Sequence, residues 1–204
     1  MVEIGTTIPG YKVCEYKIVL DPHSDLQTKI ADVRKEFNEA YKIDKIHASK
    51  ANVAFATFTQ YEMMEERIVN HLKIIALGYP PFKVELRDFG SYPTHRIFIN
   101  IVSKIPIQNL TKKIRSEVGR LMKLNDENKP HFFTDPYIHV ASKLLPWQYE
   151  KAWQEYSGKQ FTGRFIAEAM LFLKRNPTES RWQIVQRLEF QNLPVNVKQG
   201  DLFI

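Results

Sequence analysis

The feature that most constrains the fold is a series of five predicted elements that occurs twice: strand, helix, short strand, helix, strand. The first series is predicted at residues 13–20, 24–41, 52–58, 59–77 and 82–89. The second is predicted at residues 95–102, 107–121, 137–142, 147–156 and 165–173, with the short strands offset by 87 residues. This order predicts an α+β chain with two similar lobes related by an approximate two-fold axis.

Hydrophobic spacing supports these elements. Apolar residues recur every three or four positions in the first helix, at Leu26, Ile30, Val33, Phe37 and Tyr41. Ser24 and Thr59 are suited to cap the first and second helices, and Gly78 is suited to end the second. A last strand is predicted at residues 182–190. We therefore expect one two-lobed domain over residues 1–204, with repeat units at roughly 11–89 and 94–173.

The composition is that of a globular chain built without disulfides. Apolar residues make up 44% of the chain and charged residues 25%, which excludes disordered and collagen-like classes. No apolar run approaches the roughly 20 residues of a membrane helix, and residues 1–12 lack the apolar stretch of a signal peptide. Cys14 is the single cysteine, so a reducing, cytoplasmic location is expected, and a monomer is favoured.

The net charge of +6 lies in the second half of the chain. Residues 1–100 hold 13 basic and 13 acidic side chains, whereas residues 101–204 hold 16 and 10. This excess permits a phosphate-bearing ligand, although no DNA-binding motif accompanies it. The sequence also contains no glycine-rich phosphate loop, no cysteine pair, no HExxH and no GxSxG, which excludes several common nucleotide-binding, zinc-dependent and serine-dependent enzyme classes.

The two short strands carry the most informative residues. Because residues i and i+2 of a strand share a face, Asn52 and Ala54 are expected on one face of the first short strand. His139 and Ala141 are expected on one face of the second. Their neighbours on the opposite faces are apolar and would anchor the core, so the polar faces would line a shared cleft.

At these strands the sequence resembles the two-histidine (2H) phosphoesterase superfamily, in its 2′-5′ RNA ligase-like branch, whose signature is a paired His-x-Thr/Ser. Residues 47–55 resemble the first motif with its lead-in, and residues 137–141 lie where the second belongs. Residues 82–90 and 95–102 resemble the strands between the motifs, and residues 161–173 with 182–190 resemble the closing hairpin. The resemblance implies a bilobal fold with two antiparallel sheets around a central cleft and helices outside.

The resemblance also implies a chemistry. The two histidines of the family act as general acid and general base on a phosphodiester, and the hydroxyls hold phosphate oxygens; no metal or other cofactor is needed. Here His139 alone matches, since Asn52 replaces the first histidine and Ala54 and Ala141 replace both hydroxyls. An amide donates hydrogen bonds to phosphate but does not transfer a proton at neutral pH.

Other residues could serve the same site. His47 and His95 are spare histidines, and Ser142 would join the face of His139 if a bulge rotated the strand. Tyr137 could stack on a base, and Lys143 and Arg164 could pair with phosphate. His131 is expected in a surface loop.

Three functional hypotheses remain open at this point. The first is a degenerate 2′-5′ RNA ligase-like protein that binds a nucleotide or RNA phosphate with weak or no hydrolysis. The second is an active 2′,3′-cyclic phosphodiesterase that uses His139 with His47 or His95. The third is a non-catalytic interaction module on the same scaffold.

Overall fold

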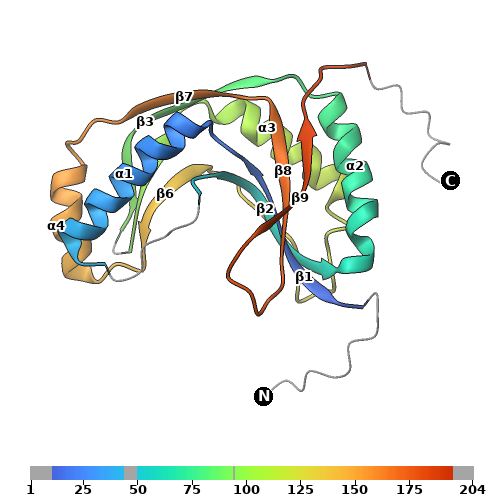
Figure 1. The fold of residues 1–204 in the computed structure, drawn as a ribbon, viewed down its shortest axis with the longest axis horizontal. Helices are drawn as coiled ribbons and strands as arrows, with labels where there is room; N and C mark the ends of the chain where they lie inside the picture. Colours follow the sequence, from blue (N-terminus) through green and yellow to red (C-terminus); the bar gives the residue numbers. More distant parts are fainter. Residues whose placement is uncertain (1–10, 44–49, 94, 195–204) are drawn as a thin grey trace.

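The strands of the described chain form two antiparallel sheets, arranged as an arch in Figure 1. The computed structural model describes residues 11–43, 50–93 and 95–194. Sheet A has the order β5-β2-β1-β8-β9, and sheet B has the order β6-β4-β3-β7. The strands of sheet A are β1 (Val13–Leu20), β2 (Val53–Tyr61), β5 (His131–Phe132), β8 (Ala169–Arg175) and β9 (Gln183–Glu189). Those of sheet B are β3 (Phe82–Tyr92), β4 (Arg96–Ile101), β6 (Tyr137–Ser142) and β7 (Thr162–Ala167).

Helices cover the outer face of each sheet. The helices are α1 (Ser24–Tyr41), α2 (Glu65–Leu77), α3 (Lys104–Val118) and α4 (Pro146–Tyr156). Helices α1 and α4 pack against sheet B, and helices α2 and α3 pack against sheet A. The predicted α+β fold with two antiparallel sheets and outer helices is therefore confirmed. No helix of the described residues is long and apolar enough to cross a membrane.

The two sheets do not correspond to the two halves of the sequence. Helix α1 follows a strand of sheet A but packs against β6 and β7, whereas α3 follows a strand of sheet B but packs against β2. Each of these helices thus covers the sheet opposite to the strand that precedes it. The exchange is consistent with the predicted duplication, which stays a prediction.

One predicted strand is in fact two. Residues 165–173 read as a single strand, but the chain leaves sheet B after Ala167 and enters sheet A at Ala169. Strand β8 is buried along Ala169–Leu173 because it lies inside sheet A. Only the exposed Glu168 separates its apolar residues from those at the end of β7.

Both predicted helix caps are wrong. The cap of α1 is His23, which makes no side-chain capping hydrogen bond, and Ser24 is already helical. Thr59 lies within β2, which extends to Tyr61 and is followed by the 3-10 turn η1 (Glu62–Met64). Helix α2 instead begins with two acidic residues, which favour a helix N-terminus. Gly78 ends this helix, as predicted.

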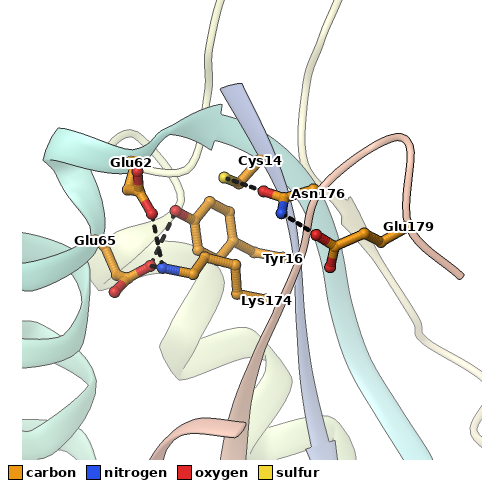
Figure 2. Close-up of polar contacts among 7 residues, drawn as sticks. All are labelled: Cys14, Tyr16, Glu62, Glu65, Lys174, Asn176 and Glu179. Carbon is orange, nitrogen blue, oxygen red and sulfur yellow. Dashed lines mark hydrogen bonds and ion pairs between the residues drawn. The ribbon is translucent and has the colours of Figure 1, made fainter. Parts of the chain in front are cut away.

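A polar cluster ties η1 and α2 to β8 (Figure 2). The Nζ of Lys174 lies 2.9 Å from a Glu62 carboxylate oxygen and 2.8 Å from one of Glu65. The Tyr16 hydroxyl donates to the same Glu65 oxygen at 3.2 Å. The hydrogen bond from Lys174 holds the pKa of Glu62 below its usual value, although burial opposes it. Lys174 therefore links the start of α2 to strand β8.

Replacing Lys174 should destabilise the fold in a pH-dependent way. We expect Lys174→Ala to lower the free energy of unfolding by about 1–3 kcal/mol, because the partly buried carboxylates of Glu62 and Glu65 lose their shared partner. Since the pKa of Glu62 is lowered in the folded state, its contribution is present above its unfolded pKa and is lost as the pH falls through the folded value. Urea unfolding of the wild type should thus lose more stability between pH 7 and pH 3 than that of the variant.

The matched control is Lys83→Ala, which removes the exposed ion pair with Glu85. Exposed pairs contribute little, so this change should stay within about 0.5 kcal/mol. Equal losses in the two variants, or parallel pH curves for wild type and Lys174→Ala, would contradict the role given to the cluster.

Candidate functional site

The two motif strands, β2 in sheet A and β6 in sheet B, approach each other where the sheets meet. Their backbones come within contact distance, and Figure 1 shows the strands side by side under the arch. The inter-sheet site is defined here as Lys17 and Ala54 of sheet A, Asn52 directly before β2, and His139 and Ser142 of sheet B. All five side chains are partly exposed.

A bulge in β6 decides which side chains accompany His139. His139 pairs with Phe98 and Ala141 pairs with Ile97, so Val140 has no partner in β4. Ala141 is 2% exposed and lies in the hydrophobic core, as does Ile97. The prediction that Ala141 shares the face of His139 is therefore wrong, because one extra residue reverses the alternation beyond it.

The same bulge brings Ser142 to the face of His139. Ser142 pairs with Arg96, and Arg96 and Phe98 are two residues apart in a regular part of β4. Cross-strand partners share a face, so Ser142 and His139 lie on the same side. A hydroxyl thus stands on this face, one residue later than the family pattern places it.

In the other motif strand, the position where the family resemblance predicts a hydroxyl holds Ala54, which lies beside apolar residues. Ala54 of β2 pairs with Val19 of β1, and the next residue of β2, Phe55, forms a bulge. Ala54 packs against a small cluster of Val19, Leu171 and Leu173. The nearest hydroxyl on this face is Thr57, which pairs with Lys17. Beside Ala54 the surface is apolar.

Lys17 reaches Asn52, the residue in the place of the first motif histidine. Its Nζ donates a hydrogen bond of 2.9 Å to Asn52 Oδ1, and Asn52 Nδ2 donates to the backbone oxygen of Lys50 at 3.1 Å. Burial, together with the positive charges of Arg175 and Arg34, lowers the pKa of Lys17 to about 8. No carboxylate of the described residues lies within ion-pair distance of Lys17.

Arg34 of α1 connects this lysine to the second motif. Its Nε and Nη2 atoms donate to the backbone oxygen of His139 at 2.9 and 2.6 Å. Arg34 is 8% exposed, and burial lowers its pKa. Its charge is close enough to act on Lys17. Two cations, Lys17 and Arg34, therefore lie at or next to the inter-sheet site.

Tyr137 lies next to His139 in an aromatic group on sheet B. Its ring centroid is 4.6 Å from that of Phe98 and 5.8 Å from that of Tyr92. Arg96 donates a short hydrogen bond to its hydroxyl, and the guanidinium carbon lies 5.8 Å from the ring centroid. Tyr137, which is predicted to stack on a base, thus already packs against two aromatic rings and an arginine of the protein.

The other predicted residues are placed less favourably. Lys143 follows β6 in a left-handed conformation with φ of 56° and is exposed. Arg164 lies on β7, at the opposite edge of sheet B from His139, and pairs with Glu85. Three strand spacings, about 14 Å, separate these edges. Arg164 is therefore not brought to His139.

The spare histidines do not provide a second motif histidine among the described residues. His95 was predicted to begin the strand, but it lies in the turn before β4, is exposed, and has its Nδ1 3.1 Å from the backbone oxygen of Pro93. It precedes Phe98, the partner of His139, by three residues or about 10 Å of strand. His47 lies outside the described residues.

Sequence reasoning missed Lys17 and Arg34, although each leaves a signal. Lys17 interrupts the otherwise apolar second half of β1, between Tyr16 and Ile18. Arg34 falls four residues after Ile30, within the apolar stripe of α1. A charged residue at a position that periodicity assigns to the interior indicates a buried polar contact or a functional site.

No group of three or more His, Cys, Asp or Glu residues suited to a metal ion occurs in the described part of the chain. The predicted chemistry without a metal stays a prediction.

Comparisons with solved structures agree on the fold. E. coli LigT complexed with 3′-AMP matches with a TM-score of 0.63 at 12% identity, over 88% of this chain and 99% of that one. The protein TT0787 of Thermus thermophilus matches with a TM-score of 0.59 at 9% identity, over 87% and 98% of the two chains. Kluyveromyces marxianus Usb1 matches with a TM-score of 0.50 at 10% identity, over 86% and 99%.

The sequence comparisons give the family. A search of curated proteins finds no significant match. The family model described as the 2′-5′ RNA ligase superfamily matches residues 22–179, which include both motif strands and three quarters of the chain. The predicted resemblance to two-histidine phosphoesterases is confirmed: the chain belongs to the 2′-5′ RNA ligase superfamily.

Proposed function

We propose that the inter-sheet site binds the phosphate of a nucleotide or of an RNA end, with weak or no hydrolysis. The observation that carries the proposal is Lys17, a partly buried cation that meets an amide rather than a carboxylate. A buried charge without a counter-ion is costly. A phosphate between Lys17 and His139 would supply that counter-ion.

Known structures of relatives support a phosphate ligand. E. coli LigT has been crystallised with phosphate, with 3′-AMP and with ATP. In this chain, Lys17, Asn52 and Ser142 offer hydrogen-bond donors on the exposed face of the site. Tyr137 offers an aromatic surface beside His139, which suits a base attached to the bound phosphate.

Weak hydrolysis follows from the residues at the motif positions. Asn52 cannot exchange a proton at neutral pH, and Ala54 lies in an apolar patch. General acid–base assistance contributes roughly 10²–10⁴-fold per group. Loss of one such group and of the first hydroxyl would leave a binding site with little of the standard reaction.

One observation favours a second candidate, an active cyclic phosphodiesterase. The pKa of Lys17 is lowered to about 8 by burial, so this lysine holds or releases a proton close to neutral pH. Lys17 would then act beside Asn52 as one proton-transfer group, with His139 as the other. This pairing replaces the predicted use of His95, which is about 10 Å along the strand from the partner of His139.

A cytoplasmic location and a monomeric state stay predictions. The third hypothesis, an interaction module, gains no specific support from the site.

Removing the Lys17 charge should weaken phosphate binding. We expect Lys17→Met to lower the affinity for 3′-AMP about tenfold to a hundredfold, because a charge-assisted hydrogen bond is lost. Isothermal titration calorimetry measures the affinity of each variant for 3′-AMP. The control is Lys73→Met, on the exposed face of α2, which should bind like the wild type. An unchanged affinity in Lys17→Met would refute the proposed site.

The affinity should also depend on pH. Because the folded-state pKa of Lys17 is lowered to about 8, its charge is lost as the pH rises through that value. Affinity for 3′-AMP should therefore fall between pH 7 and pH 9.5, and the Lys17→Met variant should show a flatter profile. Parallel profiles would show that another group governs binding.

The degree of hydrolysis distinguishes the two candidates. We expect the wild type to hydrolyse 2′,3′-cyclic AMP no faster than His139→Ala. Restoring the motif with Asn52→His and Ala54→Thr should raise the rate by about 10² or more. Clear wild-type turnover that both Lys17→Met and His139→Ala abolish would instead establish the second candidate.

A further inference from the structure

A strongly basic groove lies at the outer edge of sheet A, away from the motif residues. It has a volume of about 530 Å³ and runs between the end of α3, the segment 119–130 and β5. Its lining includes Arg115, Arg120, Lys123, Lys129, His131 and Phe132. A second cavity of about 200 Å³ shares Arg115 and Phe132 and adds Lys112, so the groove continues along α3.

In the part of the chain that the structure describes, most of the positive charge in the groove has no carboxylate partner. Every charged residue in its lining is basic. Lys123 forms an ion pair with Asp126, whose side chain is 88% exposed. Within the described residues, Arg115, Arg120 and Lys129 have no carboxylate at ion-pair distance. Clustered like charges repel one another, so a ligand with several negative charges would stabilise this arrangement.

The structural role of a helix end does not account for the whole cluster. A cation in the last turn of a helix interacts favourably with the helix dipole, which explains Arg115. Lys129 and His131 come from the other wall of the groove, where the 119–130 segment ends and β5 begins. Two separate segments therefore present cations to one space.

Aromatic side chains interrupt the basic surface. The guanidinium of Arg115 lies 5.9 Å from the centroid of the half-buried Phe132 ring. The rings of His131 and Phe133 meet edge to face at 4.6 Å. Basic side chains with aromatic neighbours are typical of surfaces that bind single-stranded nucleic acid, where phosphates contact the cations and bases stack.

The groove lies around the β5 edge of sheet A. Phe132, which pairs with the buried Ala56, faces the core and Arg115, whereas His131 lies on the face of Lys17. His131 pairs with Thr57, and Thr57 pairs with Lys17. The Phe133 amide also donates to the Phe55 carbonyl at 2.8 Å. Two strand spacings, about 10 Å, thus separate the wall of the groove from Lys17 along this row. A polynucleotide with its end in the site could reach the groove within a few nucleotides.

We propose that this groove, formed by Arg115, Arg120, Lys129 and Phe132, binds the sugar–phosphate backbone of a single-stranded RNA whose end occupies the inter-sheet site. The proposal rests on the proposed function for the position of the RNA end. It adds a second contact surface, so an oligonucleotide binds more tightly than a mononucleotide.

The test compares two ligands on the full chain. Fluorescence anisotropy measures binding of a labelled 12-nucleotide RNA with a 3′-phosphate, and calorimetry measures 3′-AMP. The variant Arg115→Gln/Arg120→Gln/Lys129→Gln should lose at least tenfold in RNA affinity and none in 3′-AMP affinity. The salt slope of its RNA binding should fall by about 2, at roughly 0.7 per lost phosphate contact.

The matched control is Lys35→Gln/Lys73→Gln/Lys151→Gln, which removes three exposed charges from outer helices. It should bind RNA like the wild type, and thermal melting should show both triple variants folded. An equal loss in the two triple variants, an unchanged salt slope in the groove variant, or no RNA binding by the wild type would overturn the proposal.

Two further arms separate the alternatives. If the groove variant loses binding to vesicles with anionic lipids but keeps RNA binding, the groove is a membrane surface and the proposal fails. If RNA binds through the groove while 3′-AMP does not bind the wild type, the groove stands and the proposed function of the inter-sheet site fails.

Discussion

The relative position of the two sheets depends on one continuous segment that crosses from one to the other. Strand β7 is an edge strand of sheet B, and β8 lies between β1 and β9 in sheet A. Glu168 is the residue that joins β7 to β8. The Glu168 carbonyl accepts a hydrogen bond of 2.7 Å from the Phe190 amide. On the sheet A side, Phe172 stacks on Tyr16 with ring centroids 5.2 Å apart. The crossing therefore fixes β1, and through β1 the motif strand β2, relative to sheet B.

The elements that the sequence predicts well are those with a complete periodic pattern. Strands β1 and β6 and the extent of α1 agree with the predicted ranges 13–20, 137–142 and 24–41, because their apolar spacing has clear ends. The crossing at Glu168 could not be predicted in the same way. Only Glu168 interrupts the apolar residues of β7 and β8, and a single exposed charged residue is also compatible with one continuous strand. The two-residue strand β5 was missed because two residues have no period.

The same limit explains the errors within the site. Alternation assigns side chains to faces only while pairing is regular, and both motif strands contain a bulge, at Phe55 and at Val140. One extra residue moves Ala141 into the core and brings Ser142 beside His139. The residues that matter electrostatically, Lys17 and Arg34, come from elements outside the motifs. Their proximity depends on tertiary packing, which sequence spacing does not encode.

If Asn52 occupies the place of the first motif histidine, as the family resemblance predicts, the site changes its chemistry but stays polar. A histidine combines a proton-transfer group and a hydrogen-bond donor in one ring. Here the two roles are divided: Asn52 offers an amide, and Lys17 brings a charge that burial has made easier to lose. An amide that accepts a hydrogen bond from an ammonium group has its own NH2 free to donate elsewhere, and Asn52 uses it on the Lys50 carbonyl. Asn52 keeps one further N–H donor that is neutral, whereas Lys17 keeps two further N–H donors that carry a charge. In the proposed phosphate site, therefore, the charge comes from the lysine of β1, and Asn52 adds a neutral donor.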